Sequence, residues 1–252
     1  MTVGGPRLPD FDARAATYDH LRPAGDAWWA RFDALVRLGE LRGQRVLDVG
    51  CGTGAVAAAL ADKAAAKVWG VEQSAEMLAV ARARVPSGVG LKQGRAEELP
   101  FRDAWFDRVL YSLVIHLVDR PRALAEAARV LVDDGRVVVA TFAHEHFDRY
   151  WAARFFPSLA GVDRARFPTE EGLAIELIAA GFADVHSVRV SSRETLDRDL
   201  AIERLRGRHI STFDLLDSDE VRRGIEQADA ELPETVVVEL EQLIVTGRRI
   251  ER

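Results

Sequence analysis

The stretch from Arg45 to Gly54 constrains the fold of this chain more than any other part of the sequence. It begins with an apolar run rich in β-branched residues, Val46 to Val49, which is typical of a buried parallel strand. Glycines follow at positions 50, 52 and 54, and residues 55–66 are almost all Ala, Val and Leu, which predicts a helix. A strand, a glycine turn and a helix bring bare backbone close to a ligand, because no Cβ stands in the way.

Asp48 is the exception in this apolar strand, a carboxylate just before the turn. A buried carboxylate is costly unless it is hydrogen-bonded. We therefore expect either the backbone N–H groups of the turn or a cationic group of a ligand to satisfy it.

Strands and helices alternate after Gln44. Further strands are predicted over 67–72, 88–93, 106–113, 136–142, 183–191 and 235–246. Helices are predicted over 75–85, where Ser74 is a good N-cap, and over 119–131, where Pro121 stands near the start. Residues 133–135 are expected to form a turn. This alternation predicts an α/β fold with a Rossmann-like, doubly wound, mostly parallel sheet of seven strands and helices on both faces.

The segments outside this alternation are predicted to be mainly helical. Helices are expected over 11–21 and 27–38, ahead of the first strand, and over 169–180. Residues 143–168 read as an insertion rich in aromatic side chains, and residues 195–231 are charged and helical in period. A chain of 252 residues can bury one large core, so we expect a single domain over 1–252.

The composition of the chain limits which binding partners and which cellular compartment we expect. A formal net charge of −6 argues against nucleic acid as the main partner, since such proteins usually present a basic face. Cys51 is the only cysteine, which favours a reducing compartment, and we expect it to be a small turn residue rather than a nucleophile. Met1 to Asp10 lacks a signal pattern, and no stretch is long and apolar enough to span a bilayer. We therefore expect a cytoplasmic protein without a membrane span.

Two classes of cofactor use a glycine turn after the first strand of such a sheet. Dinucleotides place a pyrophosphate at the helix N-terminus, and Gly50, Gly52 and Ala55 satisfy the permissive form of that fingerprint. S-adenosylmethionine carries no phosphate but offers a cationic amino group, which suits Asp48 better. Glu72 ends the second strand, where in either class an acid accepts hydrogen bonds from the ribose hydroxyls.

Several motifs lie in register along the chain. They are Val46 to Gly54, then Val71 to Ser74 with Met77-Leu78, then Gly94 to Phe101, then Phe106-Asp107 and Leu131 to Arg136. Over about residues 11–142 the chain thereby resembles the class I S-adenosylmethionine-dependent methyltransferases, most closely the small-molecule subgroup that includes quinone-biosynthesis C-methyltransferases. The resemblance implies S-adenosyl-L-methionine as the cofactor and a small-molecule acceptor. The C-terminal part fits the antiparallel strand pair that closes the family's sheet.

The resemblance also implies roles for individual residues. Gly50 and Gly52 are expected to pass close to the amino-acid end of the cofactor, with Asp48 supporting the turn. Glu72 is expected to hold the ribose. A further set is expected around the adenine and the methionyl moiety: Gln73, Met77, Ala96 through its backbone N–H, and Ser112.

The adenine motif departs from the family pattern at one position. Arg95 stands where the family usually has Asp, and a guanidinium has no acceptor for the adenine amino group. Glu97 or Glu98 is then expected to substitute, or Arg95 to stack on the ring.

Residues 1–40 resemble the family's N-terminal lid, in which Tyr18 covers the cofactor and Arg22 meets its carboxylate; a core Tyr18 and a surface Arg22 are the alternative. His116 is the best candidate for a general base or substrate contact, because it follows the fourth strand on the ligand-binding side of such sheets. His20, His144, His146 and His209 are weaker candidates, expected to be mostly solvated. Residues 143–168 and 195–232 are expected to cap the acceptor pocket, and no Cys/His cluster has metal-ligand spacing.

Three other functions stay open at this point. A dehydrogenase is one, although the chain has no Tyr-x-x-x-Lys pair. A non-catalytic module that binds the cofactor and a protein partner is another, and a methyltransferase acting on protein or nucleic acid is the third.

Overall fold

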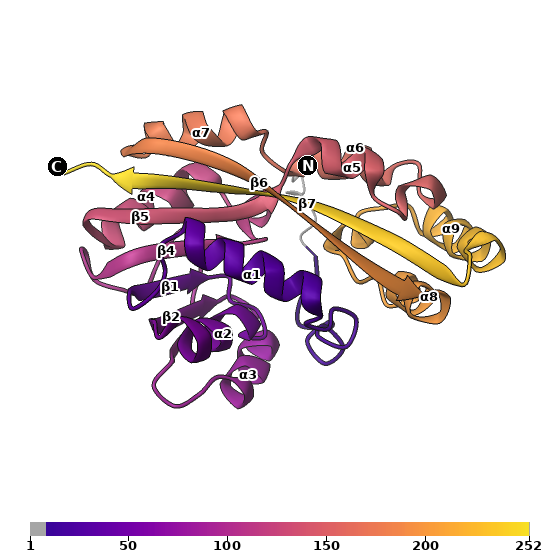
Figure 1. The fold of residues 1–252 in the computed structure, drawn as a ribbon, viewed down its shortest axis with the longest axis horizontal. Helices are drawn as coiled ribbons and strands as arrows, with labels where there is room; N and C mark the ends of the chain where they lie inside the picture. The colour runs from indigo at the N-terminus through magenta and orange to yellow at the C-terminus, as the bar shows by residue number, and fades with distance from the viewer. Residues whose placement is uncertain (1–8, 252) are drawn as a thin grey trace, which may run out of the picture.

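The computed structural model describes residues 9–251, and within this range it contains a seven-stranded sheet of order β3-β2-β1-β4-β5-β7-β6 (Figure 1). Strands β1 to β5 run parallel, and β7 is antiparallel to both β5 and β6. The strands are β1 (Arg45–Val49), β2 (Lys67–Glu72), β3 (Gly90–Gln93), β4 (Phe106–Ser112), β5 (Leu131–Phe142), β6 (Phe182–Asp197) and β7 (Thr235–Arg249). The predicted α/β sheet and its antiparallel last strand are confirmed.

The helices of the core cover both faces of the sheet. Buried side chains of α1 (Asp26–Leu38) and α2 (Ala55–Ala64) pack on one face, and those of α4 (Arg120–Val130) and α7 (Glu170–Ala179) pack on the other. Helix α3 (Ala75–Arg84) follows β2 and begins at the predicted N-cap, Ser74, whose hydroxyl accepts a hydrogen bond from the Met77 N–H at 3.1 Å.

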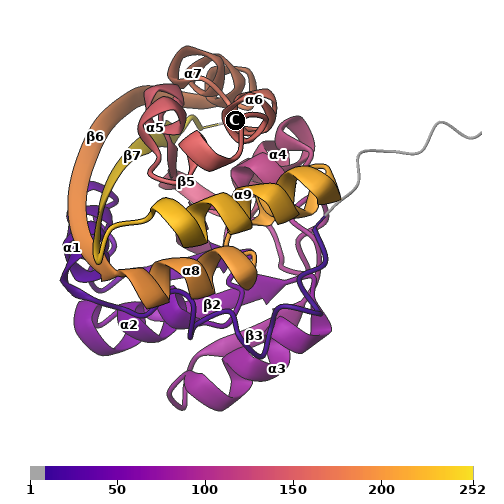
Figure 2. The same ribbon diagram turned by 90° about the vertical axis from the view of Figure 1, so that its right-hand side faces the viewer.

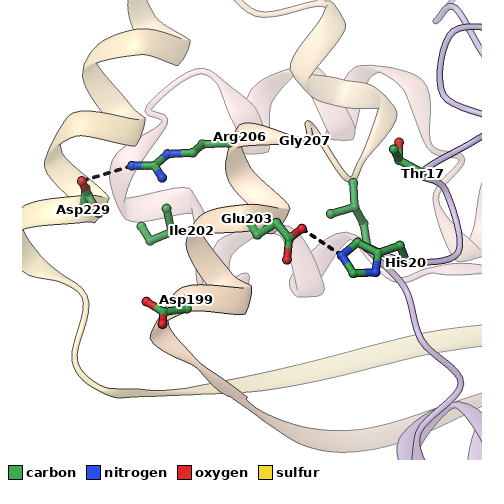
Figure 3. Close-up of a pocket in the computed structure, with 9 residues that line it drawn as sticks. Thr17, His20, Asp199, Ile202, Glu203, Arg206, Gly207 and Asp229 are labelled. Atoms are coloured by element: carbon green, nitrogen blue, oxygen red, sulfur yellow. Dashed lines mark hydrogen bonds and ion pairs between the residues drawn. The ribbon is translucent and has the colours of Figure 1, made fainter.

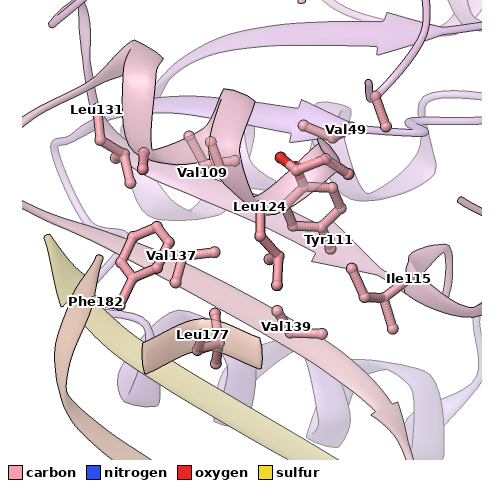
Figure 4. Close-up of a cluster of buried hydrophobic side chains, with 14 of the residues drawn as sticks. Val49, Val109, Tyr111, Ile115, Leu124, Leu131, Val137, Val139, Leu177 and Phe182 are labelled. Atoms are coloured by element: carbon pink, nitrogen blue, oxygen red, sulfur yellow. The ribbon is translucent and has the colours of Figure 1, made fainter. Parts of the chain in front are cut away.

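The core explains why the central strands are almost wholly apolar. Side chains at alternate positions, such as Val109 and Tyr111 on β4 and Val137 and Val139 on β5, point toward Leu124 and Leu177 of the covering helices (Figure 4). The buried hydroxyl of Tyr111 is satisfied, since it donates to the carbonyl of Ala123 at 2.8 Å. Burial on both faces is what demands such continuous apolar runs.

The antiparallel pair of β6 and β7 extends well beyond the core (Figure 1). The two strands pair from Phe182 with Arg249 to Asp197 with Thr235, whereas β5 pairs with β7 only over residues 242–248. The overhanging half carries a second body of structure, in which α8 (Arg198–Arg206) and α9 (Ser218–Glu231) lie side by side (Figure 2).

A separate hydrophobic cluster holds this overhanging part together. It combines residues from the β6–β7 pair, from α8 and α9, and from the segment after β5 that contains α5 (His144–Arg149), η2 (Ala153–Phe155) and α6 (Leu159–Arg166). Phe156 and Phe213, the latter on η3 (Ser211–Asp214), are fully buried and pack edge to face, with ring centroids 4.9 Å apart.

Three details differ from the sequence-based expectations. Residues 11–21 form successive turns rather than a helix, because Asp12 and Asp19 bind other parts of the chain (below). Strand β6 continues to Asp197, six residues past its predicted end and into the segment 195–232 predicted as helical, because it pairs with β7 along its length. Residues 133–135 lie within β5 as an irregularity in its pairing with β4, with Asp134 at φ +61°.

The predicted lid covers residues 1–40, and the structure describes it from Pro9 onward. Residues 1–8, which the expectation of no signal peptide partly concerns, lie outside the described residues. Across residues 9–251, no helix combines the length and apolar character needed to cross a membrane.

Candidate functional site

A cavity of about 550 Å³ lies at the carboxyl ends of β1, β2 and β4, between the core and the overhanging part. This size is within the range of small-molecule sites, roughly 300–1,000 Å³. Every site residue predicted from the sequence lines it: Tyr18, Arg22, Asp48, Gly50, Gly52, Glu72, Gln73, Met77, Arg95, Ala96, Glu97, Ser112 and His116. Residues up to 98 positions apart in the chain therefore share one space.

The glycine turn brings bare backbone to this cavity, as the sequence predicts. Gly50, Gly52 and Gly54 all have positive φ, of +69°, +54° and +77°. A Cβ at Gly50 would stand 2.5 Å from Val114, whereas at Gly52 it would meet no described atom within 4 Å. Gly52 is thus required by its backbone conformation and leaves open space above it, while Gly50 is also required by packing.

Glu72 holds the turn in this shape. One carboxylate oxygen accepts a hydrogen bond from the N–H of Gly52, and the other accepts one from the N–H of Ser74, both at 2.9 Å. A carboxylate has about four acceptor positions, so two remain available to a ligand. The bond to Gly52 was not predicted, since nothing in the sequence links these two positions.

Asp48 is buried without a partner. The residue is 1% exposed, and its Oδ2 has no hydrogen bond with any described residue. Burial, and secondly the charge of Glu72, raise the pKa of Asp48 to about 7. The turn amide that was expected to satisfy Asp48 binds Glu72 instead, which leaves a cationic ligand group as the other expectation.

Arg95 organises the side of the cavity that carries the adenine motif. Its guanidinium donates to the Gln73 side-chain oxygen at 3.1 Å and forms an ion pair with Glu97 at 3.3 Å. Glu97 also accepts from the N–H of Asp119 at 2.9 Å, whereas Glu98 is exposed to solvent. Arg95, which stands where the family usually has Asp, is therefore held in place by Gln73 and Glu97.

The N-terminal segment (residues 9–25) is tied to the core by two carboxylates. Asp12 accepts from the hydroxyl of Ser74 at 2.5 Å, at the start of α3. Asp19 accepts from the hydroxyl of Thr53 at 2.8 Å and pairs with Arg84 at 2.5 Å. These bonds hold Tyr18 at the cavity, where the Arg22 guanidinium lies over its ring at 4.1 Å.

The same segment also contacts the overhanging part. Arg14 forms an ion pair with Asp214 at 2.6 Å, and Arg22 donates to the carbonyl of His209. His20 contacts Glu203 of α8 directly, with 2.8 Å between Nε2 and Oε1, and both residues line a smaller hollow of about 410 Å³ (Figure 3). The N-terminal segment therefore bridges the two halves that enclose the cavity.

Aromatic rings line one part of the cavity. We call this set the aromatic wall: Phe142, His146, Phe147, Tyr150, Trp151 and Phe167. Phe142 and His146 stack with centroids 4.4 Å apart, and Phe167 stacks on His116 at 3.8 Å. The wall comes from the end of β5 and from the insertion after it.

His116 presents an unpaired nitrogen in this part of the site. Its Nδ1 is buried and lacks a hydrogen-bond partner within residues 9–251. Burial, followed by the charges of Arg166 and Arg22, holds the pKa of His116 well below its usual 6.5. The imidazole is therefore neutral near pH 7, with one ring nitrogen protonated and the other able to accept a hydrogen bond.

The four histidines that were weaker candidates divide into two groups. His20 is largely exposed, as expected, and His144 binds the carbonyl of Phe167 at 2.9 Å. His146 and His209 are buried and line the cavity, so the expectation of mostly solvated histidines was wrong for them. Burial lowers the pKa of His146 to about 4 and that of His209 to about 3.

Several polar residues of the cavity had no motif to reveal them. They come from α1, β6, β7, α6 and α8: Arg31, Glu194, Gln242, Asp163 and Arg204. Only the tertiary structure, in which the overhanging part folds against the core, brings all of them to one site.

Cys51 lies in the glycine turn and lines the cavity. Cys51 is buried, and burial together with the charges of Asp48 and Glu72 raises the pKa of its thiol far above the usual value, which disfavours the thiolate form. Within residues 9–251, no three His, Cys, Asp or Glu side chains are grouped to hold a metal ion.

Residues 47–139 match a family model described as a methyltransferase domain. A demethylmenaquinone methyltransferase of Renibacterium salmoninarum is 31% identical over 205 residues, which span 69% of this chain and 85% of that protein. An O-methyltransferase, cnsE, of Penicillium expansum is 39% identical over 118 residues, which span 44% of this chain and 42% of that protein.

The match to the first curated relatives is partial: the chain spans about half of their length, between 40% and 53%. Among solved structures, a putative methyltransferase from an antibiotic biosynthesis pathway of Anabaena variabilis superposes with a TM-score of 0.67 at 25% identity. That superposition covers 86% of this chain and 96% of the other.

Proposed function

Because this chain belongs to the class I S-adenosylmethionine-dependent methyltransferases, we propose that it transfers a methyl group from S-adenosyl-L-methionine to a small-molecule acceptor by in-line displacement. The observation that carries the proposal is the unpaired, buried carboxylate of Asp48 beside the open glycine turn. A cationic amino group placed over the turn would pair with Asp48 and stabilise its ionised form. A pyrophosphate there would meet a repelling charge instead.

The remaining predicted residues fit the other parts of the same cofactor. Glu72 has acceptor positions left for two ribose hydroxyls after binding Gly52 and Ser74. Met77 and Gln73 would flank the adenine, the Ala96 N–H would donate to it, and Glu97 would receive its amino group, with Arg95 holding both Gln73 and Glu97 in place.

The N-terminal segment is proposed to act as the lid. Tyr18 would cover the cofactor. Arg22 would bind the carboxylate of the cofactor after its hydrogen bond to the carbonyl of His209 breaks. Ser112, at the end of β4, would lie beside the methionyl moiety. A lid tied at both ends excludes water from the site and fixes the geometry of the reactants.

Little chemistry is asked of the protein itself. When bound, the cofactor supplies an activated sulfonium leaving group, so holding the acceptor in line with the methyl group accounts for most of the catalysis. The aromatic wall would orient the acceptor. Neutral His116, with its free Nδ1, would take a proton from an acceptor hydroxyl, amine or acidic carbon.

We propose a small-molecule acceptor because the cavity is enclosed by residues 143–168 and 195–232, which would act as its cap, and by the N-terminal segment. The relatives differ in the atom that their names give, since cnsE is named an O-methyltransferase and a relative from Citrifermentans bemidjiense, 36% identical over 126 residues, is named a ubiquinone/menaquinone biosynthesis C-methyltransferase. The single cysteine supports a cytoplasmic location, and the net charge of −6 supports the proposal that nucleic acid is not the partner.

Thermal stabilisation by candidate cofactors tests the cofactor. S-adenosylhomocysteine is expected to raise the melting temperature, and a nicotinamide dinucleotide is not. The reverse pattern would establish a dehydrogenase instead. Transfer of a labelled methyl group to a mixed pool of small molecules then tests catalysis, and binding without transfer to any acceptor would favour a non-catalytic module.

A further inference from the structure

Arg204 of α8 is a buried cation with an unused donor. It lines the cavity and is 6% exposed. Its Nη1 donates to Glu194 at 2.8 Å, but its Nε is buried and has no hydrogen-bond partner in the described part of the chain. A buried N–H without an acceptor is costly, so such a group indicates that a ligand supplies the acceptor.

A second guanidinium is available in the same cavity. Arg31 of α1 also lines the cavity, and its Nη1 donates to the hydroxyl of Ser192 at 2.8 Å. Burial lowers the pKa of Arg31, with the charge of Glu194 opposing this shift and that of Arg204 adding to it. Glu194 pairs directly with Arg204, and its charge also acts on Arg31. This Arg31–Glu194–Arg204 cluster contains two guanidinium groups and one carboxylate, so by count it carries one excess positive charge.

The cluster is joined to the aromatic wall through fixed hydrogen bonds. His209 Nδ1 donates to the carbonyl oxygen of Arg204 at 2.9 Å, so its Nε2 is the acceptor for the hydroxyl of Tyr150 at 2.6 Å. The ring of Tyr150 therefore has a set position relative to Arg204. One ligand can contact rings and cations together.

We propose that the methyl acceptor is an aromatic carboxylic acid. Its carboxylate binds the free Nε–H edge of Arg204 and the guanidinium of Arg31, which neutralises the excess charge of the cluster. Its ring lies against the aromatic wall, between the cluster and His116. This inference rests on the proposed function, because it assigns the second substrate of the same site.

Three ring compounds that differ only in one substituent test this assignment. They are 4-hydroxybenzoate, its neutral amide 4-hydroxybenzamide, and the cationic 4-hydroxybenzylamine. Binding of each is measured calorimetrically to the whole protein saturated with S-adenosylhomocysteine. The acid is expected to bind at least about 10-fold more tightly than the amide, because charge-assisted hydrogen bonds to a guanidinium are strong, and the amine is expected to bind weakest.

Two variants attribute the preference to the cluster. Arg204→Met is expected to reduce the acid-over-amide preference to within about 2-fold, whereas Glu194→Gln is expected to increase it, since it removes the competing carboxylate. Arg206→Met is the matched control, because Arg206 lies on the same helix but pairs with Asp229 at the smaller hollow (Figure 3). It is expected to leave the preference unchanged.

The outcomes separate this inference from the proposed function. Equal binding of acid and amide, no binding of the acid, or an amine preference abolished by Glu194→Gln would each overturn the aromatic-acid assignment. In all of those cases S-adenosylhomocysteine still binds, so the proposed function stands. Failure of S-adenosylhomocysteine itself to bind would overturn the proposed function.

Discussion

Replacing Asp48 by Asn is expected to stabilise the ligand-free protein in a pH-dependent way. The carboxyl of Asp48 has a pKa of about 7 in the fold against an ordinary value of 3.8. Between these two values the unfolded chain releases a proton that the folded chain retains, so the free energy of unfolding falls as pH rises. At about 1.4 kcal/mol per pKa unit, ionised Asp48 costs the fold about 4 kcal/mol above pH 7. Asn removes this cost.

The measurement is urea unfolding of both proteins, without cofactor, from pH 4 to pH 8. The free energy of unfolding of Asp48→Asn minus that of the wild type is expected to be small near pH 4. It is expected to grow to as much as about 4 kcal/mol above pH 7. Taking the difference between variants cancels the contribution of the buried histidines, which both proteins share. Asp62→Asn, at an exposed position of α2, is the control and is expected to give a difference that does not change with pH.

A difference that stays flat with pH would refute this reasoning, as would a variant less stable than the wild type at pH 8. Either result would mean that the carboxylate is solvated or paired in solution. The variant is also expected to bind S-adenosylhomocysteine more weakly, because the amide has no charge for the cofactor's amino group. A residue that destabilises the empty fold and strengthens ligand binding is typical of a functional site.

Four further predictions follow from the same geometry. Glu72→Ala is expected to weaken S-adenosylhomocysteine binding about 30- to 150-fold, from roughly 2–3 kcal/mol of lost charge-assisted hydrogen bonds, and unchanged affinity by calorimetry in a folded variant would exclude the ribose role. His116→Phe keeps the stacking on Phe167 but removes Nδ1, so kcat is expected to fall by about 10²-fold or more with the KM for the cofactor unchanged; an unchanged kcat would exclude a general base. Asp19→Asn loosens the N-terminal segment from Thr53 and Arg84, and stopped-flow measurement is expected to show the cofactor leaving about 10-fold faster, from roughly 1.4 kcal/mol, whereas an equal rate would argue against a lid. The pKa values of His116, His146 and His209 lie below 6.5 in the fold, so the unfolded chain binds protons that the folded chain does not, and the three histidines are expected to lower the melting temperature on acidification from pH 7 to pH 5; a variant with all three replaced by Gln should lose that dependence.

The sequence by itself determined the sheet and the cofactor half of the site. Buried parallel strands require continuous apolar runs, and the glycine turn requires positive φ, so both are written in local residue patterns. Since the carboxyl ends of parallel strands meet at one edge, Asp48, Glu72 and Ser112 could be placed together from their strand ends alone.

The tertiary structure alone decided the acceptor half and the true partners of the buried charges. Arg31, Glu194 and Arg204 come from α1, β6 and α8, and no local pattern relates them. The N–H of Gly52 in the turn donates to Glu72 rather than to Asp48. Which of the two carboxylates reaches this N–H depends on how the strands and the turn pack, and no local sequence pattern records that packing. Residues 11–21 became turns for the same reason, since the bonds of Asp12 and Asp19 to α3 and Thr53 are formed between segments far apart in the chain.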